Sequence, residues 1–300
     1  MLINRLSPSN FSDFNWNDEL ELQKYVLRYE KIIENKDNIQ KKNFGAFSKF
    51  IFSNALHSLV YTNNRKIILD FLYMSLQFGK AHLEFLSKGE EVSEVTLGKY
   101  KVKLKGSKEK FSTTHFKYLM IISYLFKDEK SMGELRGYLG KDLFHVYGEA
   151  GQLSLDYHML RFTKEDLERR NKLAELKEIE SQGIAHYIAL DPKESGTILM
   201  KENAKRFQMF AASKYDLHEI MVSQTEKEFN EAFKVMFPKY VEAIKNVEET
   251  KDNSNFWVIW DIVYTCCLAH EKGWEIDIAS DYFPSWLYKR EFEIPTDFPA

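Results

Sequence analysis

Two adjacent cysteines and a histidine come closest to the residue types and spacing of a metal site. Cys267 and His270 are three residues apart, with Cys266 beside them, and side chains three residues apart share one face of a helix. Zinc binds thiolate and imidazole, but a structural zinc ion takes four ligands and the sequence holds no further cysteine. We therefore expect no metal and no cofactor, and we interpret these residues as packed small side chains beside a surface histidine.

Two further spacings would suit catalysis. Asp142 and His145 lie three residues apart, which would orient an imidazole as a general base, and Ser107 and Lys110 form an SxxK pair. We interpret the first as a surface pair and the second as part of a lysine-rich loop without companion motifs. The chain contains no GxSxG elbow, no GxxxxGK[ST] loop, no HExxH and no paired CxxC. The sequence therefore names no catalytic residue, and we expect a protein that is not an enzyme.

Asp261 most requires an explanation, because it lies in the most apolar stretch of the chain. Its neighbours within about one helical turn are Trp257, Val258, Ile262, Tyr264 and Thr265. A buried carboxylate needs a partner. In one interpretation, Asp261 accepts hydrogen bonds from a tyrosine, tryptophan or arginine of a neighbouring helix. In the other it is a perturbed carboxylate in a cleft, which would make the protein a helical enzyme with a pocket around Asp261.

The composition predicts that helices position these residues. Hydrophobic residues make up 44% and aromatic residues 15% of the chain, which excludes a disordered protein. Glycine (13) and proline (6) are scarce among the 300 residues, which favours long helices over many short strands. Helical spacing of apolar residues predicts helices at residues 18–35, 44–60, 64–87, 113–127, 164–180, 183–190, 198–222, 225–244, 256–269 and 284–291. We predict a mainly α fold, with one large, bundle-like helical domain over residues 1–300.

Three stretches depart from regular helices. Near residues 92–105 apolar residues occur at every second position, which predicts a small β-hairpin. One face of this hairpin carries Lys99, Lys101, Lys103 and Lys105. These lysines would suit a docking strip, but we favour the interpretation that they protect an exposed edge strand from pairing with other chains. Residues 274–278 alternate like a short strand, and Pro238 predicts that the helix at 225–244 is kinked or divided.

Charge and hydropathy limit the possible partners. No apolar run approaches the roughly 18 residues of a membrane span, the first residues lack the apolar core of a secretion signal, and two adjacent cysteines suit a reducing compartment. We therefore expect a cytoplasmic protein that does not bind membranes.

The net charge is −3, and residues 247–300 carry 11 acidic against 4 basic residues. This balance argues against nucleic acid as the partner and leaves room for a basic protein.

Aromatic and acidic residues alternate near the C-terminal end. Tyrosine and tryptophan are enriched at the centres of protein interfaces, and acidic side chains among them would attract a basic partner. The alternative is that these aromatic residues cap the helical core. The candidate partner-binding residues are Trp274, Glu275, Asp277, Asp281, Tyr282, Trp286 and Tyr288.

Three stretches, in the right order, resemble the Immunity protein 49 family of bacterial polymorphic-toxin systems. The first is the hairpin VTLGKYKVKLKG and the helix THFKYLMIISYLFKDEKSMGEL, where Lys127 and Asp128 replace an Arg-Asp pair. The second is TEKEFNEAFKVMFPKYVEAI, which keeps the family's Phe229, Asn230, Ala232 and Tyr240 but contains Pro238. The third and most specific is IVYTCCLAHEKGWEIDIASDYFPSWL, which keeps Cys267, Leu268, Ala269, Gly273, Ser280, Asp281, Tyr282 and Pro284. Ala279 stands where the family usually has glutamate.

This resemblance covers roughly residues 90–290. It implies a largely helical cytoplasmic protein that binds a cognate bacterial toxin domain and blocks it, protecting the producing cell and its siblings. Inhibition of this kind needs stoichiometric association and no turnover, which agrees with the lack of catalytic spacing. The partner is then a protein, and neither a nucleic acid nor a membrane. A helical scaffold for several partners is a further hypothesis, which predicts binding without protection.

Overall fold

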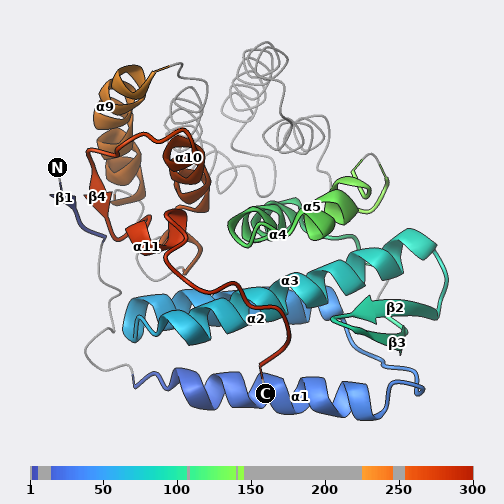
Figure 1. The fold of residues 1–300 in the computed structure, drawn as a ribbon. Helices are drawn as coiled ribbons and strands as arrows, with labels where there is room; N and C mark the ends of the chain where they lie inside the picture. The colour runs from blue at the N-terminus through green and yellow to red at the C-terminus, as the bar shows by residue number, and fades with distance from the viewer. Residues whose placement is uncertain are drawn as a thin grey trace, which may run out of the picture. The chain divides into compact units, whose positions relative to one another are not determined.

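The computed structural model describes residues 2–5, 15–106, 109–139, 141–144, 225–245 and 254–299. Within these ranges the chain is mainly helical, and its strands form two small sheets of two strands each (Figure 1). The prediction of a mainly α fold is therefore confirmed. The helices predicted at residues 164–180, 183–190 and 198–222 lie outside the described residues. None of the described helices is long and apolar enough to cross a membrane.

The chain forms two compact units, and each takes in one end of the chain. Unit 1 comprises residues 1–7 and 146–289, and unit 2 comprises residues 8–145 and 290–300. Each terminal segment therefore belongs to a unit whose other residues lie far away in sequence. The single domain over residues 1–300 stays a prediction.

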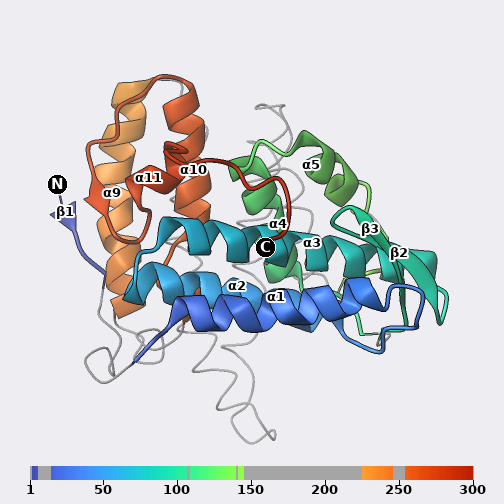
Figure 2. The same cartoon turned by 60° about the horizontal axis from the view of Figure 1, so that its bottom comes forward.

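The described part of unit 2 is built on capped helices. These are α1 (Asp18–Glu34), α2 (Phe44–Tyr61), α3 (Arg65–Lys88), α4 (Thr113–Leu125) and α5 (Glu129–Arg136). Before each helix, a polar side chain accepts a hydrogen bond from a backbone N–H of the first turn; the capping residues are Asn17, Asn43, Asn64, Ser112 and Asp128. α1, α2 and α3 run side by side (Figures 1 and 2). Most residues of α3 are buried, so this helix lies at the centre of the unit.

A glycine and a polar network hold α2, α3 and α4 together. A Cβ atom at Gly79 of α3 would overlap the Leu119 side chain of α4, so a larger residue here would require Leu119 to shift. Ser48 Oγ of α2 donates to the carbonyl of Ser75 on α3 (2.6 Å) and lies 2.7 Å from Nε2 of His115 on α4. Burial lowers the pKa of His115 to about 3, so this imidazole is neutral in the folded chain at neutral pH.

The predicted hairpin is present as β2 (Ser93–Leu97) and β3 (Tyr100–Leu104). Its buried face consists of Val95, Leu97, Val102 and Leu104. The chain just after α1 hydrogen-bonds along the other edge of β3, where the Gln40 N–H donates to the Lys103 carbonyl (2.8 Å) and the Lys105 N–H donates to the Gln40 carbonyl (2.9 Å). The interpretation of the lysines as guards of a free edge is therefore wrong for β3, because that edge is already paired.

The C-terminal tail, residues 290–299, packs onto unit 2. The Arg290 guanidinium donates to the carbonyls of Tyr124 (3.0 Å) and Leu125 (3.1 Å) at the end of α4, where carbonyl groups have no partner within the helix. The Phe298 ring stacks on Tyr29 of α1, with ring centroids 3.7 Å apart. The tail therefore closes the core of unit 2 on the side of α1.

The described part of unit 1 contains three α-helices, one short 3-10 helix (η2) and a sheet of two short strands. The elements are α9 (Glu226–Lys245), η2 (Ser254–Phe256), α10 (Trp260–Glu271), α11 (Ser285–Tyr288) and the parallel pair β1 (Leu2–Ile3) and β4 (Ala279–Ser280). α9 is continuous through Pro238, so this proline does not divide the helix, and the other expected outcome, a kink, stays a prediction. Residues 274–278 do not form the expected strand, which instead follows them as β4. Their backbone is bound by a side chain, as described below.

We predict that His115 makes unit 2 sensitive to acid. Burial lowers its pKa from 6.5 to about 3, so between these values the unfolded chain binds a proton that the folded chain does not. Stability therefore falls as the pH drops below 6.5. Between pH 7 and pH 5, His115→Gln should lose about 2 kcal/mol less unfolding free energy than the wild type. Urea denaturation followed by circular dichroism at both pH values measures this difference.

His270→Gln is the matched control, because His270 lies exposed at the end of α10. This variant should lose as much stability between pH 7 and pH 5 as the wild type. Equal losses in His115→Gln and the wild type would contradict the assignment of the acid sensitivity to the buried imidazole.

Candidate functional site

Residues 274–281, which we call the acidic segment, follow α10, include β4 and run beside α9 (Figure 1). Glu275, Asp277 and Asp281 are exposed, and Trp274 is partly exposed. Of the candidate partner-binding residues, the structure thus brings these four together on one accessible stretch of unit 1. Exposed carboxylates beside an indole ring are the groups that would meet a basic protein surface.

The side chain of Asn230 binds the backbone of the acidic segment from α9. Its Nδ2 donates to the Glu275 carbonyl (2.8 Å), and its Oδ1 accepts from the Asp277 N–H (3.0 Å). Asn230 is only 6% exposed, so losing these hydrogen bonds would leave its own buried amide unsatisfied. One amide therefore fixes the register of the segment against α9.

Two charged residues of α9 add to this attachment. Glu226 Oε1 accepts from the Glu275 N–H (3.1 Å), and Lys234 forms an ion pair with Asp277 (2.5 Å). Glu226, Asn230 and Lys234 are spaced by four residues, so they lie along one face of the helix. The acidic segment therefore lies along a polar stripe of α9.

Aromatic contacts fix the first residue of the segment. The Trp274 ring lies against Phe229 of α9, with centroids 5.7 Å apart, and Lys272 Nζ lies 4.5 Å from the centroid of the Trp274 ring. Phe229 is buried, so it ties the indole to the core. Trp274 is thus a partly exposed ring that a buried ring holds in place, as is common for interface anchors.

The charges of the acidic segment are only partly balanced. Asp277 is paired with Lys234. Burial lowers the pKa of Arg5, and the neighbouring Asp281 carboxylate partly offsets this effect. The exposed Glu275 side chain forms no ion pair with any residue that the structure describes. Its carboxylate is thus the charge in this segment most available to a partner.

The other three aromatic candidates belong to the core. Tyr282, Trp286 and Tyr288 are 1%, 5% and 5% exposed, so the expectation that they present rings to a partner needs correction. They pack where the chain turns back from β4 into α11, and the Tyr282 ring lies against Phe237 of α9 (6.4 Å between centroids). For these residues the alternative interpretation, that they cap the helical core, fits their burial. The candidate surface is therefore narrowed to Trp274, Glu275, Asp277 and Asp281.

The cysteines are core residues as well. Cys266 and Cys267 are buried free thiols, and burial raises the pKa of the Cys266 thiol well above its usual value. Cys267 Sγ donates to the carbonyl of Tyr288 (3.3 Å), whereas His270 is exposed. Among the described residues, no group of three or more histidine, cysteine, aspartate or glutamate side chains is arranged to hold a metal ion.

Ser48 and His115 form a serine–histidine pair at the contact distance of a nucleophile and its base, which no sequence motif indicates. Their positions 67 residues apart gave no local signal. Ser48 is 0% and His115 is 4% exposed, and the Ser48 hydroxyl already donates to a carbonyl. A substrate has no access to this oxygen, so the pair stabilises the packing of the core.

Two other pairs were singled out from the sequence. Of their residues, Asp142 binds Lys110, while His145 and Ser107 lie outside the described residues.

Asp261 lies in the first turn of α10 and is 9% exposed. A carboxylate at this position is stabilised by the helix dipole, which is a structural reason for an acid in an apolar stretch. The Thr265 hydroxyl donates to the backbone carbonyl of Asp261 (2.8 Å), so the turn is closed by a side chain. The hydrogen bond expected from a tyrosine, tryptophan or arginine of a neighbouring helix stays a prediction.

One comparison with known proteins identifies a relationship. Residues 159–287 match the family model of Immunity protein 49, which confirms the resemblance read from the sequence. The described part of this match contains α9, α10 and the acidic segment, whereas the hairpin and α4 lie outside it. No curated protein and no solved structure matches the chain.

We predict that Asn230→Ala loosens the acidic segment. The change removes the hydrogen bonds of Asn230 to two peptide groups of the segment, so it should lower the unfolding free energy by about 1–3 kcal/mol. Amide hydrogen exchange at Asp277 should become faster than in the wild type, because its N–H loses its acceptor. Urea denaturation and exchange measured by mass spectrometry test both effects.

Asn38→Ala is the control, since Asn38 is exposed and its amide makes a single, long hydrogen bond (3.3 Å) to another exposed asparagine. It should change the unfolding free energy by less than about 0.5 kcal/mol. If Asn230→Ala is as mild as this control and leaves exchange at Asp277 unchanged, Asn230 does not hold the segment.

Proposed function

We propose that this chain is an immunity protein, which binds a cognate secreted bacterial toxin domain and neutralises it by stoichiometric association. The match of residues 159–287 to the Immunity protein 49 family model carries this proposal. Neutralisation by occupation requires a complementary surface and no reacting group. In this proposal the protein acts in the cytoplasm of the producing cell, and neither nucleic acid nor a membrane is its partner.

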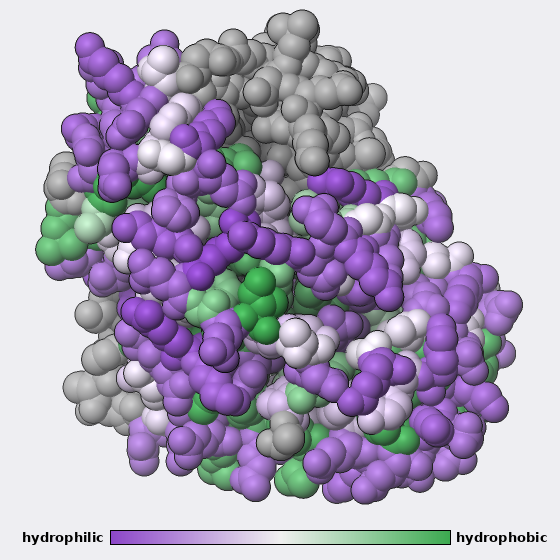
Figure 3. Space-filling model, in the orientation of Figure 1, coloured by the Kyte–Doolittle hydropathy of each residue, from purple (hydrophilic) through white to green (hydrophobic). Residues whose placement is uncertain are grey.

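The acidic segment is the surface that we assign to the toxin. Its backbone is bound to α9 through Asn230, so little conformational entropy is lost when a partner binds. Its exposed carboxylates would speed the encounter with a basic toxin surface, and Trp274 supplies an aromatic anchor. On the face shown in Figure 3, hydrophobic areas are small and separate among hydrophilic residues, which favours recognition by charge.

We predict that Glu275→Lys impairs neutralisation. The toxin domain encoded by a neighbouring gene would be expressed in bacteria with wild-type or variant chain, and cell survival would be scored beside the dissociation constant of the purified pair. The wild type should rescue growth. Glu275→Lys should raise the dissociation constant at least tenfold at low salt, because it reverses the charge facing a basic partner, and this difference should shrink as salt rises.

Glu242→Lys is the matched control, because Glu242 is also exposed in unit 1 but lies in α9 outside the acidic segment. It should bind and protect like the wild type, and so should Asp261→Asn. Failure of the wild-type chain to rescue poisoned cells would refute the proposed function. Rescue that Glu275→Lys leaves intact would refute only the assigned surface.

A further inference from the structure

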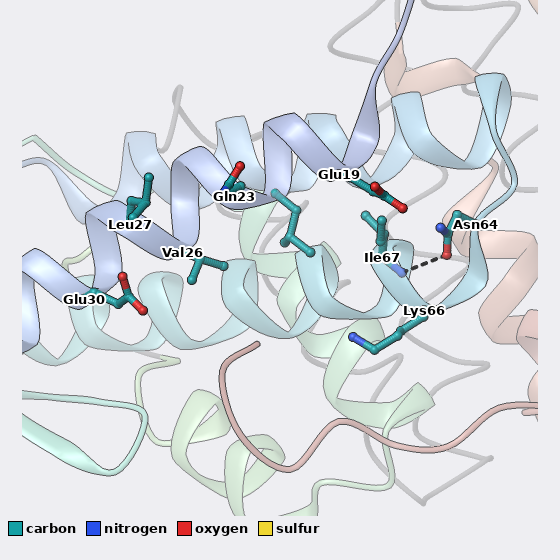
Figure 4. A pocket seen from close by; sticks show the side chains of 9 residues that line it. Glu19, Gln23, Val26, Leu27, Glu30, Asn64, Lys66 and Ile67 are labelled. Atoms are coloured by element: carbon teal, nitrogen blue, oxygen red, sulfur yellow. Dashed lines mark hydrogen bonds between the residues drawn. The ribbon is translucent and has the colours of Figure 1, made fainter. Parts of the chain in front are cut away.

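Unit 2 carries a groove that the proposed function does not use. It lies between α1 and the first turn of α3 and has a volume of about 450 Å³. Figure 4 shows Glu19 and Glu30 at its two ends, with Gln23, Val26 and Leu27 of α1 between them and Ile67 and Lys66 on the side of α3. The groove therefore has an apolar middle and acidic ends.

The charges at the ends of the groove are not balanced. Neither Glu19 nor Glu30 forms an ion pair with a described residue, and both are exposed. Lys66 is the basic residue of the lining, and Asp70 already binds its Nζ (2.8 Å). The groove as a whole is thus negative, and an occupant with positive charge at both ends would complement it.

The apolar middle of the groove is accessible. Leu27 is 48% exposed, and it lies beside the partly buried Leu22 and Val26 in the lining. These residues and Ile67 sit where two neighbouring helices meet, and a groove between two helices accepts the apolar side chains of a third. A helix is therefore the shape of occupant that fits.

We propose that this groove binds an amphipathic helix of a partner protein, with apolar residues at helical spacing flanked by lysine or arginine. Glu19 and Glu30 are eleven residues apart on α1, which is about 16 Å along a helix. Basic residues about three turns apart on the partner helix would meet both carboxylates, with the apolar residues between them on Leu22, Val26 and Leu27. This surface lies in unit 2 and is independent of the acidic segment and of the toxin assigned to it.

The probe is a pair of fluorescein-labelled synthetic helical peptides of 18 residues, used with the full chain. Both carry leucines at i, i+4 and i+7; one has flanking lysines eleven residues apart, and the other has glutamates there. Fluorescence anisotropy should show that the lysine peptide binds at least tenfold more tightly than the glutamate peptide. The doubly substituted Glu19→Lys, Glu30→Lys chain should reverse this preference, whereas Glu242→Lys should keep it.

Leu27→Ser tests the apolar contact against a matched control. Leu20 is 50% exposed on the same helix but does not line the groove, so neither substitution opens the core. Leu27→Ser should weaken binding of the lysine peptide at least fivefold, and Leu20→Ser should leave it unchanged.

Three results would overturn the inference: equal binding of both peptides, no reversal by the charge substitutions, or equal effects of Leu27→Ser and Leu20→Ser. Sedimentation could also show that the wild-type chain is a dimer and that Leu27→Ser abolishes the dimer. This result would mean that the groove binds a second copy of the chain instead. Because the probes are synthetic, these outcomes do not depend on whether a toxin is neutralised.

Discussion

The two hydrogen bonds of the Asn230 side chain to the acidic segment are the interaction on which the candidate binding surface depends. A run of exposed acidic residues has no tendency to order itself, and ordering it at the moment of binding would cost affinity. Asn230 removes this cost beforehand, because it projects from a helix whose own phenylalanines are fixed in the core. The rigidity of the surface thus comes from α9, while the exposed charges come from the chain that crosses it.

Burial separates residues with similar chemistry into different roles in this protein. Tyr282 and Trp286 follow the acidic segment closely in sequence, yet they fill the core. The contact between Ser48 and His115 would suit catalysis in a cleft. In the centre of unit 2 the imidazole is neutral and no substrate reaches the hydroxyl, so the same geometry only joins three helices. The recognition that we propose therefore rests on a few exposed residues and not on the buried aromatic ones.

Local signals in the sequence were sufficient for α1 to α4 and the hairpin. Helical spacing of apolar residues placed α1 to α4 closely, and alternation placed β2 and β3. Contacts between distant residues gave no such signal. The family resemblance picked out Phe229 and Asn230, but the bond from Asn230 to Glu275 spans 45 residues, and nothing in the sequence named that partner. Period-two alternation also suggested a strand at 274–278. The side chains of this segment do alternate in exposure, but its backbone bonds to side chains of α9 and not to another strand.

The most direct test of neutralisation by occupation is a titration of the cognate toxin's activity with the purified chain. A protein that works by covering its target should abolish activity linearly and reach zero at about one equivalent, when both are present well above their dissociation constant. Complete inactivation by a small fraction of an equivalent would show turnover and contradict a purely binding role. Full activity in excess chain would contradict neutralisation itself.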